Sequence, residues 1–306
     1  MRSREAATVR ETPAAHRGRA PQLVTVIIPI RNMAASLERQ LEALAAQDYG
    51  GAWEVVVADN GSTDDLRSAV RRWSDRLPGL RIVPATGPPG SNTARNAGMR
   101  AATGDYLCFC DADDVVAPGW LEAMARAGTR SDVVGGRLED HLNEPDERAW
   151  RFPYDPDRLP VALGFLPYVF SGNLGVWKEA AMRLGGWSQD FRQGGDADFS
   201  WRAHLRGLRV GYAPDAVVRY RYRSSAASLA KQVYRYGRGE VLLYKRFREA
   251  GAPRTKLRNA LRTWAWIVLK SFYAFRSPRH RGIWVRRAAY RMGRIAGSIR
   301  HRVVYL

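Results

Sequence analysis

Residues 106–114 read Tyr106-Leu107-Cys108-Phe109-Cys110-Asp111-Ala112-Asp113-Asp114. The first five residues are apolar and follow Gly104 and Asp105, which is typical of a short buried strand. Three carboxylates directly after such a strand repel one another unless a cation lies between them. Carboxylate oxygens suit Mg²⁺ or Mn²⁺, which keep several waters and also bind substrate phosphates. For this motif alone, an acidic turn into the next helix stays an alternative interpretation.

Upstream of this stretch, predicted strands alternate with amphipathic helices. Strands are expected over residues 24–30, 53–58 and 81–84, and helices over 36–47 and from the loop after 64 through 73. Ser36 is the expected N-cap of the first helix. Such alternation indicates an α/β fold with a mostly parallel sheet and right-handed crossovers.

Polar residues follow the strands at their carboxyl ends, where ligands of such sheets bind. Separate segments therefore bring these residues to one edge: Arg31, Asp59, Asn60, Asp111 and Asp113. We expect a binding site at this edge.

Six motifs resemble those of the family 2 glycosyltransferases, which use nucleotide sugars and have the GT-A fold, and they occur in the order of that family. They are V-T-V-I-I-P-I-R-N (24–32), A-D-N-G-S-T-D (58–64), A-R-N-A-G-M-R-A-A-T-G-D-Y-L-C-F-C-D-A-D-D (94–114), S-G-N-L-G-V-W (171–177), G-G-W-S-Q-D-F (185–191) and G-G-D-A-D-F-S-W-R-A-H-L-R-G (194–207). The resemblance covers roughly residues 22–220 and implies a GT-A catalytic domain there.

The resemblance also implies where the donor and its metal bind. Asp59 and Asn60 match the pair that holds the base and ribose, although the second residue is more often Asp. Asp111 and Asp113 match the D-x-D that binds the ribose and the metal-bound diphosphate. Mg²⁺ or Mn²⁺ is therefore expected on Asp113 and Asp111, with Asp114 as a further candidate.

Three more residues belong to the donor site that the resemblance implies, namely Pro29, Arg31 and Arg95. Arg95 is expected near the base or phosphates, with a plain salt bridge as the alternative. Arg31 stands where an aromatic residue often stacks on the base. This departure leaves the nucleotide open, and UDP is the default.

Asp196 matches the family's general base for the acceptor hydroxyl, and Gly195 replaces the Glu that usually precedes it. Such a transfer needs a carboxylate within hydrogen-bond reach of the attacking hydroxyl. Gly194 and Gly195 allow a close approach of the backbone to a substrate. Asp198 and Arg202 are expected on the acceptor side, or as an ordinary helical ion pair. N-capping of the helix 197–205 is the alternative role of Asp196.

The positive charge of the chain is concentrated in its last third. The formal net charge is +19, and residues 216–306 contain 23 Lys and Arg against two Glu. Helices are expected over 225–249, 257–275 and 283–299. Lys270 interrupts the most apolar of them, so no segment reaches the roughly 18 apolar residues of a membrane span.

Aromatic residues beside cations favour a helix that lies on an anionic bilayer. We expect residues 221–306 to form a separate amphipathic region that contacts such a membrane through 225–306. Nucleic acid is the competing partner, but no nucleic-acid-binding motif is present. A solvated basic face packed on the catalytic domain is the third possibility.

The chain is therefore expected to be an inverting, metal-dependent transferase, cytoplasmic and peripheral on the inner face of a bacterial plasma membrane. Its acceptor would be a cell-surface glycan or a lipid-linked saccharide. Residues 232–236, Q-V-Y-R-Y, resemble the Q-x-x-R-W of processive polysaccharide synthases. Those enzymes have several transmembrane helices, so a non-processive reaction is expected. The alternatives are transfer to a polyprenyl phosphate and a non-catalytic protein that binds membrane or nucleic acid.

Three segments carry weaker signals. Residues 1–21 are rich in Arg, Ala and Pro and predict a disordered basic tail. Residues 141–160 predict a loop near the acceptor side. Cys108 and Cys110 predict packed thiols of a reducing compartment.

Overall fold

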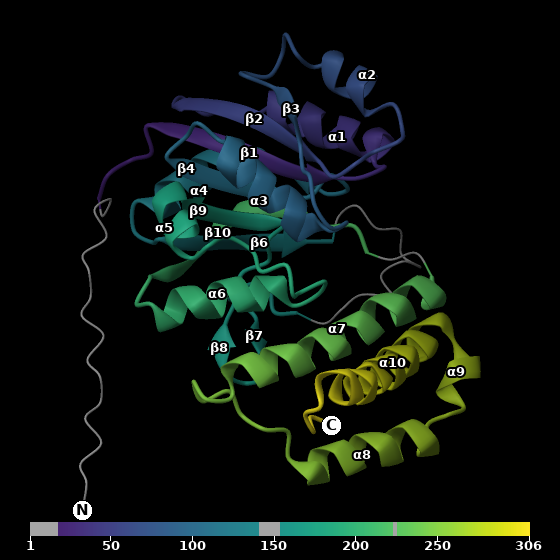
Figure 1. Cartoon of the computed structure of the whole chain (residues 1–306). Helices are drawn as coiled ribbons and strands as arrows, with labels where there is room; N and C mark the ends of the chain where they lie inside the picture. The colour runs from purple at the N-terminus through teal and green to yellow at the C-terminus, as the bar shows by residue number, and fades with distance from the viewer. Residues whose placement is uncertain (1–17, 141–153, 223–224) are drawn as a thin grey trace, which may run out of the picture.

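The computed structural model describes residues 18–140, 154–222 and 225–306. An eight-stranded sheet with the order β3-β2-β1-β4-β9-β6-β10-β5 occupies one half of the molecule (Figure 1). Its strands are β1 (Leu23–Ile30), β2 (Ala52–Asp59), β3 (Arg81–Pro84), β4 (Tyr106–Cys110), β5 (Val115–Val116), β6 (Val133–Glu139), β9 (Asn173–Trp177) and β10 (Val210–Arg219). A separate hairpin contains β7 (Val161–Ala162) and β8 (Leu166–Pro167). Most of the expected tail 1–21, and residues 141–153 of the expected loop, lie outside the described residues.

The sheet is mostly parallel and confirms the predicted α/β fold. Strand β1 pairs in parallel with β2 and with β4, and β2 pairs in parallel with β3. The antiparallel strand β9 lies between β4 and β6. Strands β1, β2 and β4 consequently end side by side, so the segments that follow them meet at one edge.

Six helices accompany the sheet: α1 (Ala34–Ala45), α2 (Leu66–Arg71), α3 (Ser91–Ala101), α4 (Trp120–Gly128), α5 (Lys178–Arg183) and α6 (Gly195–Leu205). The apolar face of α1 buries Leu37, Leu41 and Leu44 completely. All five residues of β4 are buried as well. Full burial of such a side chain contributes about 1.5–3 kcal/mol to folding, so this core holds the strand ends in place. Cys108 and Cys110 are free, buried thiols, as predicted.

The start of α1 differs from the prediction that Ser36 is its N-cap. The helix begins at Ala34, and Met33 stands at the N-cap without a side-chain hydrogen bond. Asp64, from the loop after β2, accepts a hydrogen bond from the Ala34 backbone nitrogen at 2.8 Å. A residue thirty positions away thus satisfies a free N–H group of the first turn, and the Ser36 prediction is wrong.

The last third of the chain forms a helical layer on the opposite side of α6 from the sheet (Figure 1). Its helices are α7 (Ala226–Phe247), α8 (Leu257–Leu269), α9 (Tyr273–Arg276) and α10 (Pro278–His301). The helix expected over 257–275 is therefore interrupted after Leu269, and the last helix begins earlier than expected. Among the described residues, no helix is long and apolar enough to cross a membrane.

Helices α7 and α10 approach each other closely because glycines lie at their crossing. A Cβ atom on Gly237 would lie 2.2 Å from the Tyr290 carbonyl oxygen, and one on Gly293 would lie 2.1 Å from that of Tyr234. Beside this contact, Arg294 forms an ion pair with Glu240, with 2.6 Å between Nη2 and Oε2. The pair is therefore held by close backbone packing and by a largely buried ion pair.

We predict that Gly293→Val destabilises the protein, because the new side chain meets backbone atoms of α7 that cannot move independently. The free energy of unfolding should fall by about 1–3 kcal/mol, the usual cost of overpacking. Denaturant unfolding measures it. Ala289→Val on the same helix is the control for β-branched helix propensity, and an equal loss in both variants would contradict the close crossing.

Candidate active site

A cavity of about 730 Å³ lies at the carboxyl ends of the central strands. From the sheet side it is lined by Pro29 near the end of β1, by Arg31 after β1, by Asn60 after β2, and by the acidic stretch after β4. From the other side it is lined by the turn before α6 and by one face of α7. The predicted edge of the sheet is therefore one wall of the cavity.

Asp111 and Arg95 form an ion pair on this wall. The Arg95 Nη2 donates to Asp111 Oδ1 at 2.8 Å, and Nη1 donates to the Ser91 hydroxyl at 3.1 Å. The Arg95 side chain is only 7% exposed. The salt-bridge alternative for Arg95 is thus present, and both residues also line the cavity.

The acidic turn is held by a buried glutamine that sequence reasoning missed. Gln40 of α1 donates to the Asp111 carbonyl oxygen at 3.3 Å and accepts from the Val116 nitrogen at 2.9 Å. Asp114 is buried and accepts from the Arg221 nitrogen at 3.0 Å. Asp113 is partly exposed and lines the cavity. Nothing in the spacing of Gln40 distinguishes it from other polar helix residues, so the sequence alone carries no signal for this role.

The carboxylates of the acidic stretch are the candidate ligands of a metal ion. Among the described residues, no group of three or more His, Cys, Asp or Glu side chains is placed to hold a metal ion. Mg²⁺ is commonly bound by only one or two carboxylates together with substrate phosphates. Asp113 fits that requirement because it is partly exposed and lines the cavity. Asp111 also lines the cavity, although its Oδ1 accepts from Arg95, whereas Asp114 is buried and accepts a backbone hydrogen bond.

Asp59 and Asn60 shape the loops beside the cavity. Asp59 Oδ1 accepts from the Ser62 nitrogen at 2.8 Å, and only Asn60 of the two lines the cavity. Asn60 donates to the Ala85 carbonyl oxygen and accepts from the Gly90 nitrogen, both at 2.8 Å. The amide therefore joins the ends of β2 and α3, which explains why Asn serves at this position.

Asp196 lies in the first turn of α6 and faces the cavity. Its Oδ1 accepts a hydrogen bond from the Ser171 hydroxyl at 2.5 Å, and Ser171 in turn accepts from Trp187 Nε1 at 2.8 Å. Burial raises the pKa of Asp196; the Arg95 guanidinium and the Ser171 hydrogen bond act in the opposite sense, and the Asp111 charge adds to the rise. A carboxylate with a raised pKa beside a cavity is suited to accept a proton.

The glycines before Asp196 have separate structural reasons. Gly194 has a φ of 84°, a left-handed conformation that favours glycine. At Gly195, a Cβ atom would lie 2.8 Å from Asn92 Nδ2. Asn92 is itself fixed, because its Nδ2 donates to the carbonyl oxygens of Ser188 and Phe191. Asn92 therefore accounts for a glycine where the family usually has Glu.

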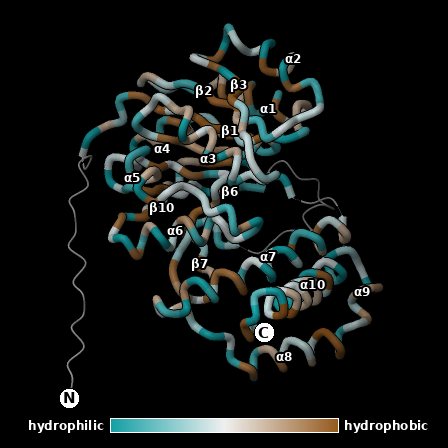
Figure 2. The backbone as a smooth tube through the Cα atoms, in the orientation of Figure 1, coloured by the Kyte–Doolittle hydropathy of each residue, from teal (hydrophilic) through white to brown (hydrophobic). Residues whose placement is uncertain are grey.

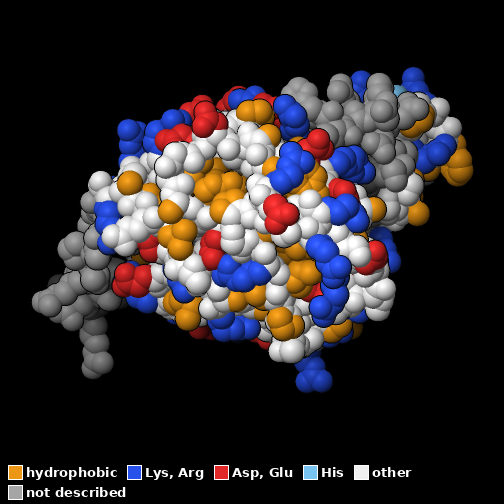
Figure 3. Space-filling view, turned by 90° about the horizontal axis from the view of Figure 1, so that it is seen from above, with side chains coloured by type: hydrophobic (Ala, Val, Ile, Leu, Met, Phe, Trp, Pro, Cys, Tyr) orange, Lys and Arg blue, Asp and Glu red, His pale blue; other side chains and the backbone are white. Residues whose placement is uncertain are grey.

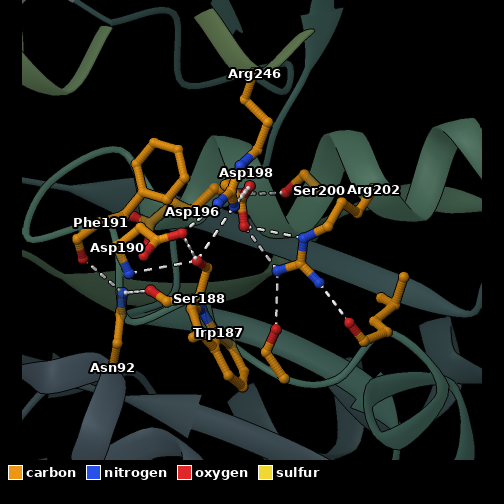
Figure 4. A network of polar contacts seen from close by, with 12 residues as sticks. Asn92, Trp187, Ser188, Asp190, Phe191, Asp196, Asp198, Ser200, Arg202 and Arg246 are labelled. Carbon is orange, nitrogen blue, oxygen red and sulfur yellow. Dashed lines mark hydrogen bonds and ion pairs between the residues drawn. The ribbon is translucent and has the colours of Figure 1, made fainter. Parts of the chain in front are cut away.

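Asp198 and Arg202 form the helical ion pair that their spacing predicts, and they do not line the cavity. Asp198 is fully buried; its Oδ2 accepts from Arg202, and its Oδ1 accepts from Arg246 Nη1 of α7 at 2.8 Å. Arg246 also donates to Asp190 and lies over the Phe191 ring at 4.8 Å (Figure 4). This network ties α7 to the segment that leads into Asp196.

Helix α7 supplies a wall that was not expected to belong to the site. Lys231, Arg235, Tyr236 and Glu240 line the cavity at helical spacing, and Tyr290 of α10 lies beside them. Tyr168 and Asp196 line the same cavity. Burial raises the pKa of Tyr168, and the charges of Asp196, Tyr236 and Glu240 add to the rise. The site therefore continues past residue 220, and only the similarity of residues 232–236 to Q-x-x-R-W pointed to this.

Two family models match the chain. The model described as glycosyl transferase family 2 matches residues 25–185, and the one described as glycosyl transferase family group 2 matches residues 160–293. The chain is 28% identical over 250 residues to the glycosyltransferase AglE of Haloferax volcanii, covering 80% of each protein. Other curated relatives are longer, and the match covers about half of their length: 52% of the pre-mycofactocin glycosyltransferase of Mycobacterium tuberculosis and 52% of the validoxylamine A glucosyltransferase of Streptomyces hygroscopicus.

Solved structures of similar shape are glycosyltransferases with the GT-A fold. The mannosyltransferase PcManGT from Pyrobaculum calidifontis, in complex with GDP-Man and Mn²⁺, has a TM-score of 0.63 and 22% identity, over 93% of this chain and 89% of that one. Glucosyl-3-phosphoglycerate synthase from Mycobacterium tuberculosis, with Mn²⁺, UDP and phosphoglyceric acid, has a TM-score of 0.55 and 18% identity, over 76% and 80%. At these identities the likeness establishes the fold.

We predict that Arg246→Met loosens the segment before Asp196, because Asp190 and Phe191 lose their contact with α7. Trypsin should then cut faster after the exposed Arg192. The free energy of unfolding should fall by about 1–3 kcal/mol, as for lost hydrogen bonds to charged groups. Arg248→Met is the control, because the ion pair of Arg248 is with the neighbouring Glu249 and not with the segment before Asp196. Equal cleavage after Arg192 in both variants would rule out the contact as an anchor.

Proposed function

This chain belongs to glycosyl transferase family 2 and is a glycosyltransferase with the GT-A fold, and we propose that it catalyses inverting, non-processive transfer from a nucleotide diphosphate sugar to a hydroxyl group. The observation that carries the proposal is the position of Arg95. Its guanidinium pairs with Asp111, and a Cβ atom on Gly172 would lie 2.7 Å from Asp111 Oδ2. The adjacent Ser171 donates to Asp196, and the positive charge of Arg95 acts against the rise in the pKa of that carboxyl group. The expected donor residues and the expected base therefore share one small part of the cavity.

In this proposal Asp113 and Asp111 hold Mg²⁺ or Mn²⁺. The metal, when bound, offsets the negative charge that develops on the leaving diphosphate. Pro29, Arg31, Asn60 and Arg95 surround the nucleotide and its phosphates, while Asp59 shapes the turn after β2. GDP-Man and UDP in the two solved structures support a nucleotide donor. UDP stays the default, and GDP is the second nucleotide to test.

Asp196 takes the proton of the acceptor hydroxyl as that oxygen attacks the anomeric carbon from the face opposite the leaving group. This direction of attack inverts the anomeric configuration. Ser171 donates its hydrogen bond to Oδ1 and so keeps the carboxylate oriented, and Gly194 and Gly195 border the space next to it. Asp198 and Arg202 lie outside the cavity lining and hold α6 in position through their ion pair.

The wall formed by α7 supports an extended acceptor. Beyond Asp196 the cavity is lined by aromatic side chains that suit contacts with sugar rings, among them Tyr168, Phe170 and Tyr236. We therefore propose a glycan or a lipid-linked saccharide as acceptor. The setting that fits such an acceptor is the inner face of a bacterial plasma membrane, with the enzyme as a peripheral protein of the cytoplasm.

Asp113→Ala is expected to abolish Mn²⁺-dependent donor binding and turnover together, because the diphosphate loses its bridging cation. Thermal shift with a panel of UDP- and GDP-sugars identifies the donor first, since a ligand of the native state raises the unfolding midpoint. The exposed Asp75→Ala is the matched control. A donor-induced shift in Asp113→Ala as large as in the wild type would disprove the metal assignment.

Asp196→Asn is expected to keep donor affinity while transfer falls by roughly 10²-fold or more, because the amide cannot accept a proton. The acid limb of the wild-type pH–rate profile should report the raised pKa of Asp196: activity falls as the pH drops through that value. Ser171→Ala removes a hydrogen bond that lowers this pKa, so its acid limb should move to higher pH. Transfer by Asp196→Asn at the wild-type rate would place the base elsewhere.

A further inference from the structure

Helices α8 and α9 and the turn between them expose large apolar side chains. Leu257, Leu261, Val268, Leu269 and Phe272 recur at helical spacing and are 49–73% exposed, and Phe275 follows at 86%. Large apolar side chains rarely gather in the open on a monomeric protein, so such a face indicates a binding surface. Figure 2 shows hydrophobic stretches along this outermost helical layer, far from the sheet.

The other side of α8 is already occupied by α10. Ala260 and Ile267 are buried there, and Trp284 Nε1 donates to the Ile267 carbonyl oxygen at 2.9 Å. Arg291 donates to the Thr263 hydroxyl at 2.9 Å, and Arg287 lies 4.0 Å from the centre of the Trp266 ring. Helix α8 is thus anchored through one face, and its orientation directs the apolar face outward.

Cations surround this face without any acidic residue. The 57 residues from Ala250 to Leu306 contain 14 Lys and Arg and no Asp or Glu. Exposed cations along the face and its ends are Arg254, Lys256, Arg258, Arg262, Arg276 and Arg279. The opposite end of the molecule differs, because acidic and basic side chains are mixed there (Figure 3). The partner of the α8–α9 face must therefore be both apolar and anionic.

We propose that the apolar face of α8 and α9 docks in the interfacial region of an anionic lipid bilayer. A helix with one apolar face and flanking cations is suited to lie in the headgroup region, with its apolar side chains in the acyl boundary. A second copy of the chain fits less well, because a symmetric pair would place cations against cations. Nucleic acid offers bases that stack on aromatic rings but no apolar layer that would bury the aliphatic Leu261 and Leu269.

The α8–α9 face is the surface that would carry the membrane contact, and this proposal rests on the proposed function. That residues 221–306 form a separate region stays a prediction. Helix α10 packs against α7, and α7 lines the cavity. Truncation near residue 250 would remove α10 and disturb that wall. The docking face is therefore tested with point variants of the full chain.

The test is co-sedimentation with sucrose-loaded vesicles of phosphatidylcholine, with and without 30% phosphatidylglycerol. The wild type should bind the anionic vesicles, dissociate partly in high salt and bind neutral vesicles weakly, since salt screens charges and leaves the apolar contribution. Leu261→Asp/Leu269→Asp should bind the anionic vesicles at least roughly 10-fold more weakly. Met182→Asp, at a half-exposed apolar site on α5, should bind like the wild type.

A second pair of variants tests the positive charges beside the apolar face. Both double variants change the net charge of the protein by the same amount. Arg258→Glu/Arg262→Glu should lose the preference for anionic vesicles, whereas Arg39→Glu/Arg67→Glu, on the exposed surface of α1 and α2, should keep it. Equal binding by all variants would overturn the proposal. Two other results would also overturn the proposal. One is binding to single-stranded RNA that depends on the arginines but not on Leu261 and Leu269, and the other is self-association that Leu261→Asp/Leu269→Asp abolishes.

The experiment uses neither donor nor acceptor, so it is independent of the proposed reaction. Circular dichroism and the thermal midpoint verify that each variant is folded. Loss of vesicle binding with an unchanged donor-induced thermal shift would support the face alone, without bearing on the catalytic residues. Conversely, a protein that binds vesicles and no nucleotide sugar would leave the docking face intact and refute the proposed donor.

Discussion

The site depends on a positive charge, that of Arg95, which offsets the negative charge of carboxylates that the fold brings to one place. Parallel strands β1, β2 and β4 end at the same edge, and the carboxylates after β4 face Asp196 from α6 across the cavity. Arg95, held in α3 and largely buried, is paired with one of them and close to the other. The positive charge of Arg95 pairs with Asp111 and acts against the rise in the pKa of Asp196. Without this charge, burial would raise the pKa of Asp196 further.

The helical layer, through α7, forms the second wall of the cavity and contacts the segment that carries the proposed base. Arg246 of α7 contacts the buried Asp198 and the segment before Asp196 (Figure 4). A residue fifty positions later in the chain therefore helps to position the proposed base. The same helix presents Lys231, Arg235 and Tyr236 to the cavity and packs through Gly237 against α10. One helix thus contributes to the cavity wall, to the position of the base segment and to the attachment of the outer helices. Its loss would affect all three.

Local patterns predicted the parts of this architecture that local physics determines. The strands 81–84 and 106–110 have the predicted bounds, because apolar runs bounded by turn residues leave little freedom. Interactions between distant residues escaped prediction: Asp64 caps α1, Gln40 holds the acidic turn, and Asn92 excludes a side chain at Gly195. Each involves a common polar residue whose partner is defined only by the folded chain. The glycines of the α7–α10 crossing escaped for the same reason, since their spacing acquires meaning only once the second helix is in place.

The order of the helical layers bears on the choice between a lipid phosphate and a lipid-linked saccharide as acceptor. Helix α10 lies between α8 and α7 (Figure 1), and the cavity is lined by α7 and by Tyr290 of α10. Packed helices are separated by 8–10 Å, so a bilayer against the outer face of α8 would lie about 10 Å from α10 and about 20 Å from α7. Helix α6, which carries Asp196, lies beyond α7 (Figure 1). A phosphate at the headgroup level would not reach Asp196 from there without leaving the membrane. A saccharide of several residues would span this distance while its lipid stayed anchored, which favours the saccharide as the acceptor.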